Sequence, residues 1–201
     1  MNTDTETPRT KATLRKRELI IEAAVECFIE RGFHQTSIRD IAGVAGISVG
    51  NLYNHFASKS ALILHLAELE LGELETYVSI LEITGDPQKT LTEFVDRFLD
   101  YSADPVNAAL TVEFFAEAMR NAEIGDAFSK NRTIITKALK GLIVRGQKSG
   151  DFVSEVDVEQ SPEVILDLIE GFAIRSTQSK MKLDKAARKE LHRIIKRYLY
   201  E

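Results

Sequence analysis

Apolar side chains return every three or four positions along most of this 201-residue chain, which is the spacing of one face of an α-helix. Leu91, Phe94 and Phe98 follow this spacing, and the segment 191–199 repeats it. Only residues 152–158 alternate as a strand does, and we interpret them as a loop because no second such segment is present to pair with them. The sequence therefore predicts an all-α protein.

Proline and glycine mark where the helices begin and end. Pro87, Pro105 and Pro162 each follow an Asp or Ser that can cap a helix, and proline fits the first helical turn, where its missing N–H has no partner to lose. Helix ends are predicted at Gly32, Gly85 and Gly150. We predict about nine helices, over residues 12–31, 38–45, 49–55, 59–84, 87–102, 105–121, 125–149, 162–179 and 184–200.

Charge divides the chain into two parts. Residues 1–60 carry eight Lys/Arg against seven Asp/Glu, residues 61–201 carry 18 against 24, and the net charge is −5. Five basic residues lie between Arg9 and Arg17 with no acid among them. The N-terminal part is therefore the candidate for contact with a polyanion such as nucleic acid, and the acidic remainder is not.

Several protein classes are not expected from this sequence. The single cysteine, Cys27, rules out an internal disulfide or a cysteine-rich zinc site and fits a reducing compartment. We expect no signal peptide, because the N-terminal segment has no apolar core, and no membrane span, because no apolar run approaches about 18 residues. The sequence motifs of zinc peptidases, serine hydrolases and nucleotide-binding enzymes are absent, as is the Glu-x-x-His of di-iron bundles. We expect a cytoplasmic protein that is not an enzyme and holds no metal or cofactor.

Two short helices joined by a glycine turn carry the functional signal. Ser37, with an acid three residues later, has the spacing of a capping box for the helix 38–45. Gly46 ends that helix, and Ser48 caps the next one, 49–55. This is the pattern of a helix-turn-helix, whose second helix enters the major groove of DNA.

The residues around this motif resemble the DNA-binding domain of the TetR/AcrR family of bacterial transcriptional regulators, over about residues 14–64. The matching positions are Ile20, Ala23, Ala24, Phe28, Gly32, Phe33, Thr36, Ser37, Ile41, Ala42, Ala45, Gly46, Ile47, Ser48, Gly50, Leu52, Tyr53, His55, Phe56, Ser58, Lys59 and Leu62. The resemblance implies a disordered tail over 1–11, a three-helix DNA-binding domain over 12–58, and a helical effector-binding and dimerisation domain over 59–201.

Carried over by position, the resemblance implies four groups of DNA-contacting residues. The residues that face the major groove are Ser48, Val49, Gly50 and Asn51. The residues that hold phosphates are Thr36, Tyr53, His55 and Lys59. Ser37 and Arg39 contact the DNA from the preceding helix, Arg39 at a base or a phosphate. The residues that follow the backbone or the adjacent minor groove are Arg15, Lys16 and Arg17.

The helix 105–121 has an apolar face too wide for a surface helix, which favours a central position. With the helices 87–102 and 162–179 it offers an aromatic lining that suits an apolar effector, and ordinary core packing is an equal alternative. The candidate effector residues are Phe94, Phe98, Tyr101, Phe114, Phe115, Met119, Phe172 and Arg175. The arginine among them either meets an anionic ligand, pairs across an interface or snorkels to solvent. We interpret Glu113 and Glu117 as a solvated face.

The family resemblance further implies a homodimer, and the helices 162–179 and 184–200 offer apolar stripes for a four-helix interface. The expected interface residues are Ile165, Leu168, Ile169, Phe172, Leu191, Ile194, Ile195, Tyr198 and Leu199. We expect a repressor that binds a palindromic DNA operator and is released when a small-molecule effector pushes the helix 59–84. An activator, or a DNA-binding protein regulated without a small ligand, is the alternative, and no membrane partner is expected.

Overall fold

The computed structural model describes residues 8–178 and 183–200, and in these ranges the regular structure is entirely α-helical. The helices are α1 (Pro8–Gln35), α2 (Ile38–Val44), α3 (Val49–Tyr53), α4 (Lys59–Leu81), α5 (Pro87–Ser102), α6 (Pro105–Ala118), α7 (Ala122–Ser149), α8 (Ser161–Gln178) and α9 (Lys185–Tyr200). The all-α prediction is confirmed, and residues 152–158 form a loop as predicted.

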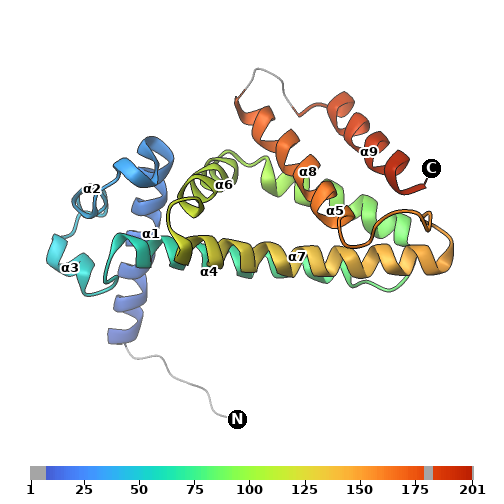
Figure 1. Ribbon diagram of the computed structural model, residues 1–201. Helices are drawn as coiled ribbons and strands as arrows, with labels where there is room; N and C mark the ends of the chain where they lie inside the picture. Colours follow the sequence, from blue (N-terminus) through green and yellow to red (C-terminus); the bar gives the residue numbers. More distant parts are fainter. Residues whose placement is uncertain (1–7, 179–182, 201) are drawn as a thin grey trace, which may run out of the picture.

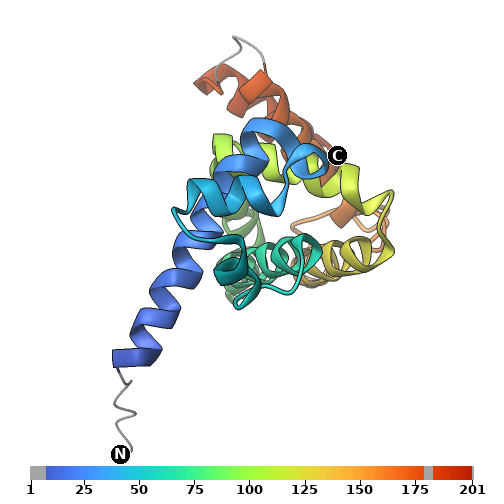
Figure 2. The same ribbon diagram turned by 90° about the vertical axis from the view of Figure 1, so that its left-hand side faces the viewer.

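The helices form a head and a body. Figure 1 shows α1, α2 and α3 gathered at one end of the molecule, with α4 and α7 running side by side away from them. The remaining helices α5, α8 and α9 pack together over the far part of α7, and α6 lies between the head and these helices. Figure 2, which looks onto the head, shows the N-terminal half of α1 projecting beyond the body.

The first helix begins earlier than the sequence pattern predicted. It starts at Pro8, so the predicted disordered tail over 1–11 is wrong for residues 8–11, while residues 1–7 lie outside the described part of the chain. Gly32 breaks the helix where its end was predicted, with φ 77° and ψ 164°, and a short helical segment continues to Gln35. Such a positive φ is readily adopted only by glycine.

Most of the predicted helix caps are confirmed. Asp86 and Asp104 each accept two backbone N–H bonds ahead of a proline in the first turn, and Gly150 ends α7 in the left-handed conformation. The start of α8 differs from the prediction. Ser161 is itself buried and donates its hydroxyl to the carbonyl of Asp157, whose carboxylate accepts the N–H bonds of the turn before the helix.

Two hydrophobic cores stabilise the molecule, and they do not divide at the start of α4. The head core joins α1, α2 and α3 to the first two turns of α4, and it also includes Phe114 of α6 and Ile124 of α7. The body core is formed by the rest of α4 with α5, α7, α8 and α9. The head core therefore includes side chains from two body helices, α6 and α7.

Candidate DNA interface and effector cavity

Hydrogen bonds close in sequence build the helix-turn-helix. The predicted capping box is confirmed, because Ser37 N–H donates to Asp40 Oδ2 at 2.9 Å and Asp40 N–H donates to Ser37 Oγ at 3.2 Å. The pKa of Asp40 is lowered because its carboxylate accepts bonds from the hydroxyl and then the backbone N–H of Ser37. Gly46 makes the turn with φ 66°, and Ser48 Oγ then caps α3 by accepting Asn51 N–H at 3.2 Å.

The outer surface of α3 carries most of the predicted base-reading residues. Ser48 and Gly50 are exposed, Asn51 is partly exposed and Tyr53 has an exposed fraction of 50%. Val49 differs from the prediction, because its side chain packs in part against the head core and less of it faces solvent. The exposed edge of α3 is therefore polar and narrow, with a glycine at its centre.

Basic side chains flank this edge unequally. Arg15, Lys16 and Arg39 are exposed and can reach a phosphate backbone. Arg17 was predicted to follow the DNA, but its guanidinium lies 4.4 Å from the centre of the Phe56 ring and donates to the carbonyl of His55 at 3.5 Å. Arg17 thus attaches α1 to the turn that follows α3, and its contact with DNA stays a prediction.

The phosphate contact predicted for Thr36 is also corrected. Its exposed fraction is 1%, and its hydroxyl lies 2.8 Å from the carbonyl of Gly32 and 3.0 Å from that of Cys27, inside the head. The hydroxyl thereby connects the residue that follows α1 to one carbonyl before the break at Gly32 and to one at the break itself.

Lys59 likewise belongs to the structure of the head. Its Nζ donates to the carbonyls of Phe33 at 2.6 Å, Thr36 at 2.9 Å and His34 at 3.3 Å. An ammonium has three N–H donors, so this arrangement leaves none for a phosphate and contradicts the predicted contact. The first residue of α4 is instead fastened to the end of α1.

The same segment of α1 is held from the other side by the body. Glu113 of α6, predicted to lie on a solvated face, is partly buried, and its Oε2 accepts the N–H of Phe33 at 2.7 Å. A side chain at Gly32 would come within 2.9 Å of this carboxylate oxygen and would displace it, and the φ of 77° already favours glycine there. The Phe33 ring also packs edge-on against Phe114, with 5.2 Å between ring centres. Phe33 is therefore the residue at which α4, α6 and the head meet.

The candidate effector residues do not line one pocket. An inner cavity of about 30 Å³ is bounded by Phe98 and Tyr101, and an outer pocket of about 300 Å³ by Tyr101 and Phe114. Phe172 and Arg175 line a separate groove of about 430 Å³ between α8 and the start of α9.

Three of the candidate effector residues line neither the inner cavity, nor the outer pocket, nor this groove. Phe94 is fully buried in the body core. Phe115 is 41% exposed against Phe128, and Met119 is 81% exposed where α6 ends. The prediction of a single pocket between α5, α6 and α8 is thus corrected to a small inner cavity and a larger outer pocket that reaches α1.

Sequence reasoning missed the polar residues of these cavities, which are Glu70, Asn131, Arg132 and Glu170. The pattern did contain a signal for two of them. Glu70 interrupts the apolar stripe of α4 between Ala67 and Leu74, and Asn131 interrupts that of α7 between Ile124 and Ile135. A polar residue at a core position needs a partner or a function.

The predicted dimer residues need the same kind of correction. Five of them are buried within the single chain, namely Ile165, Ile169, Leu191, Ile195 and Leu199. Leu168, Phe172 and Ile194 are partly exposed, Tyr198 is 37% exposed, and Val164, not predicted, is 40% exposed. The outward faces of α8 and α9 are therefore narrower than the apolar stripes suggested.

The described residues contain neither a helix suited to cross a membrane nor a cluster suited to bind a metal ion. None of the helices there is both long and apolar enough to cross a bilayer. Within the same residues, no His, Cys, Asp and Glu side chains gather in a group that could hold a metal ion.

Comparison with known proteins identifies the family. Residues 20–66 match the model of bacterial regulatory proteins of the tetR family, and residues 87–200 match the C-terminal model of BetI-type transcriptional repressors. The regulator UidR of Escherichia coli K12 is 28% identical over 169 residues, covering 77% of this chain and 78% of its own.

Solved structures share the whole fold. Salmonella enterica GusR is 27% identical with a TM-score of 0.73, covering 98% of this chain and 99% of its own. A regulator from Saccharomonospora viridis, solved with choline, has a TM-score of 0.80 at 23% identity, over 94% of this chain and 99% of its own. The chain therefore belongs to the tetR family of bacterial regulatory proteins, as a transcriptional regulator whose C-terminal region is of the BetI repressor type.

Proposed function

We propose that two copies of this chain bind a palindromic DNA operator as a repressor and that a small-molecule effector in the body releases them. The observation that supports operator binding most strongly is the exposed polar edge of α3, flanked by the exposed cations Arg15, Lys16 and Arg39. Bases are read from the start of a recognition helix, while basic residues position it on the phosphates. In this role the protein binds chromosomal DNA in the cytoplasm and catalyses no reaction.

The dimer would use the outward faces of α8 and α9 in place of their buried stripes. Val164, Phe172 and Tyr198 offer apolar surface there, next to the groove that Phe172 shares with the start of α9. A two-fold interface places the same patch on both copies, so each copy would present one α3 to one half-site. The half-sites are then separated by about 34 Å, one turn of DNA.

Release would pass through the contacts around Phe33. A ligand in the outer pocket touches Ile21 and Val25 of α1 as well as α4 and α6, so it bears on the helices that hold Phe33 from both sides. A ligand shifts an equilibrium only by its difference in affinity for the two states, and a shift from 1:99 to 99:1 needs about 5.5 kcal/mol. This coupling extends the expected push on α4 to include α1 and α6.

Footprinting on the DNA upstream of its own gene and of the adjacent genes tests the function. We expect a protected palindrome whose half-sites lie about one helical turn apart, and loss of protection when the DNA-contacting surface of α3 is altered. Protection without two-fold symmetry, or no protection at any of these promoters, contradicts the proposal.

A further inference from the structure

Two cavities meet at one point in the centre of the molecule. The outer pocket of about 300 Å³ lies between α1, α4 and α6, and the inner cavity of about 30 Å³ lies between α4, α5, α7 and α8. Glu70, Tyr101 and Thr111 belong to the walls of both. The outer pocket has the volume of a small-molecule site, and the inner one has room for a water molecule or a small chemical group.

An amide fixes the carboxylate of Glu70 at this junction. Asn131 has an exposed fraction of 4%, and its Nδ2 donates to Glu70 Oε2 at 2.9 Å and to the carbonyl of Ala67 at 2.7 Å. In the part of the chain that the structure describes, neither Lys nor Arg forms an ion pair with Glu70. The carboxylate is thus oriented by a neutral partner and lacks a positive one.

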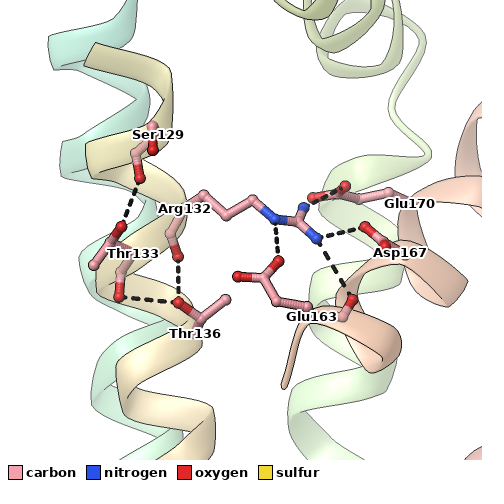
Figure 3. A network of polar contacts seen from close by, with 7 residues as sticks. All are labelled: Ser129, Arg132, Thr133, Thr136, Glu163, Asp167 and Glu170. Carbon is pink, nitrogen blue, oxygen red and sulfur yellow. Dashed lines mark hydrogen bonds and ion pairs between the residues drawn. The ribbon is translucent and has the colours of Figure 1, made fainter. Parts of the chain in front are cut away.

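Arg132, which also lines the inner cavity, already forms ion pairs with other carboxylates. Figure 3 shows the guanidinium of Arg132 reaching from α7 to three carboxylates of α8. Its Nε lies 2.6 Å from Glu163, its Nη2 2.5 Å from Asp167 and its Nη1 2.8 Å from Glu170. One positive charge therefore serves three negative ones, and it leaves none for Glu70.

The electrostatic result is a cavity that is short of positive charge. Burial, and to a smaller extent the charge of Glu170, raise the pKa of Glu70. Burial also raises the pKa of Glu170, although Arg132 acts in the opposite direction. A carboxylate held away from water without a counter-charge is costly to the fold, so its presence calls for a compensating partner.

The walls of the outer pocket suit the rest of such a partner. Glu73 adds a second carboxylate, and the residues that line this pocket include no basic side chain. Leu66 and Leu110 supply apolar surface, while the rings of Tyr101 and Phe114 supply faces that attract a cation. The lining thus combines negative charge, aromatic rings and an apolar wall.

We propose that the effector is an organic cation with an apolar body, whose positive group pairs with Glu70 beside Tyr101 and whose body fills the outer pocket against α1. This inference rests on the proposed function and specifies the chemical class of its effector. Protonated amines and quaternary ammonium compounds share the required chemistry.

Calorimetry on the full-length chain without DNA tests the proposal. The probes are hexyltrimethylammonium and hexylammonium, with heptanol and heptanoate as the neutral and anionic counterparts. We expect at least one cation to bind wild-type protein at least tenfold more tightly than heptanol or heptanoate. Glu70→Gln should weaken that cation at least tenfold, and the matched control Glu75→Gln, on an exposed part of α4, should stay within twofold. Equal binding of cations, heptanol and heptanoate, or an unchanged cation affinity in Glu70→Gln, would overturn the proposal.

A second measurement needs no ligand. Glutamine keeps an oxygen for Asn131 and removes the uncompensated charge, so Glu70→Gln should raise the Tm of the free protein. Because the folded-state pKa of Glu70 is raised, wild type is penalised once the carboxylate ionises, and the Tm advantage of the variant should grow from about pH 5 to about pH 8. Glu75→Gln should show no such trend. A lower Tm for Glu70→Gln across this range would contradict the proposal.

Operator binding, measured on the same preparations, distinguishes a failure of the cation proposal from a failure of the repressor function. If wild type protects its operator but distinguishes none of the cations, the cation proposal fails and the repressor function stands. If wild type binds the cation but no operator, the proposed function fails while the ligand class stands.

Discussion

The DNA-binding head and the cavity of the body hold their polar groups in different ways. Within the helix-turn-helix of the head, the capping bonds join residues three positions apart, as in Ser37 with Asp40 and Ser48 with Asn51. In the body, Glu70 bonds to Asn131 across 61 positions and Arg132 to Glu170 across 38. The recognition surface is therefore fixed by local geometry, whereas the cavity depends on how α4, α7 and α8 pack.

Phe33 is where the two regions meet. Lys59 holds its carbonyl and Glu113 holds its N–H, one from the first residue of α4 and the other from α6. Phe33 is thus bonded from both sides, in addition to the packing of α6 and α7 against the head core. The predictions below test whether each contact belongs to the fold, to the DNA surface or to the connection between them.

The largest loss of stability is expected from charges placed in the body core, at residues that the sequence pattern assigned to the dimer interface. Leu191→Asp with Ile195→Asp should unfold the chain, because each aspartate would be an uncompensated buried charge at roughly 3–5 kcal/mol. Val164→Asp with Phe172→Asp, on the outward face of α8, should give folded monomers instead. Circular dichroism and light scattering on both pairs check this, and a folded dimer of the second pair would place the interface elsewhere.

Lys59 separates fold from DNA contact. Lys59→Met should destabilise the protein by about 1.5–3 kcal/mol, since three carbonyls lose a charged donor. The dependence of operator affinity on salt should keep its slope, measured at a temperature where the variant is folded. A salt slope lower by about one unit in the variant would show that Lys59 does contact a phosphate.

Two residues of the head should divide specificity from general affinity. Asn51→Ala should cost about 1–3 kcal/mol at particular base pairs and relax the sequence preference there. Lys16→Ala should weaken specific and random DNA alike and lower the salt slope by about one unit. Fluorescence anisotropy with operator and random duplexes makes the comparison, and the reverse pattern would exchange the two roles.

The smallest effect is expected at the bond between Glu113 of α6 and Phe33 of the head. Glu113→Ala should reduce the coupling between effector and operator by about 1 kcal/mol, while operator affinity alone stays within a few-fold. Glu117→Ala, one turn further along α6, is the matched control and should leave the coupling unchanged. Equal coupling in both variants and wild type would show that the bond to Phe33 carries no signal.

These contrasts explain what the sequence could predict. Helix type and position follow from caps and periodicity, which are local, and Asp86, Asp104 and Gly150 behave as such residues should. The direction of an apolar stripe is also local, but which surface covers it is not. Leu191 and Ile195 form a good stripe, and the stripe packs against the same chain, so a helical wheel cannot separate core from interface.

The same reasoning applies to the candidate sites. Family position marked Thr36 and Lys59, but position does not tell whether a polar side chain faces DNA or bonds to carbonyls near the end of α1. The cavity was harder to predict, because Glu70 and Asn131 are far apart in the sequence and are recognised as a site only through the bond between them. Polar interruptions in the stripes of α4 and α7 were the available signal.

The central claim is that effector and operator compete through the contacts around Phe33. Calorimetry with the tightest-binding cation of the panel, first with free protein and then with protein saturated with operator DNA, tests it directly. Linkage requires that operator weaken the cation by the same factor by which the cation weakens operator. We predict a weaker cation affinity in the operator complex, by that factor. Equal affinity in the two titrations would contradict the account, even with the cation bound in the cavity.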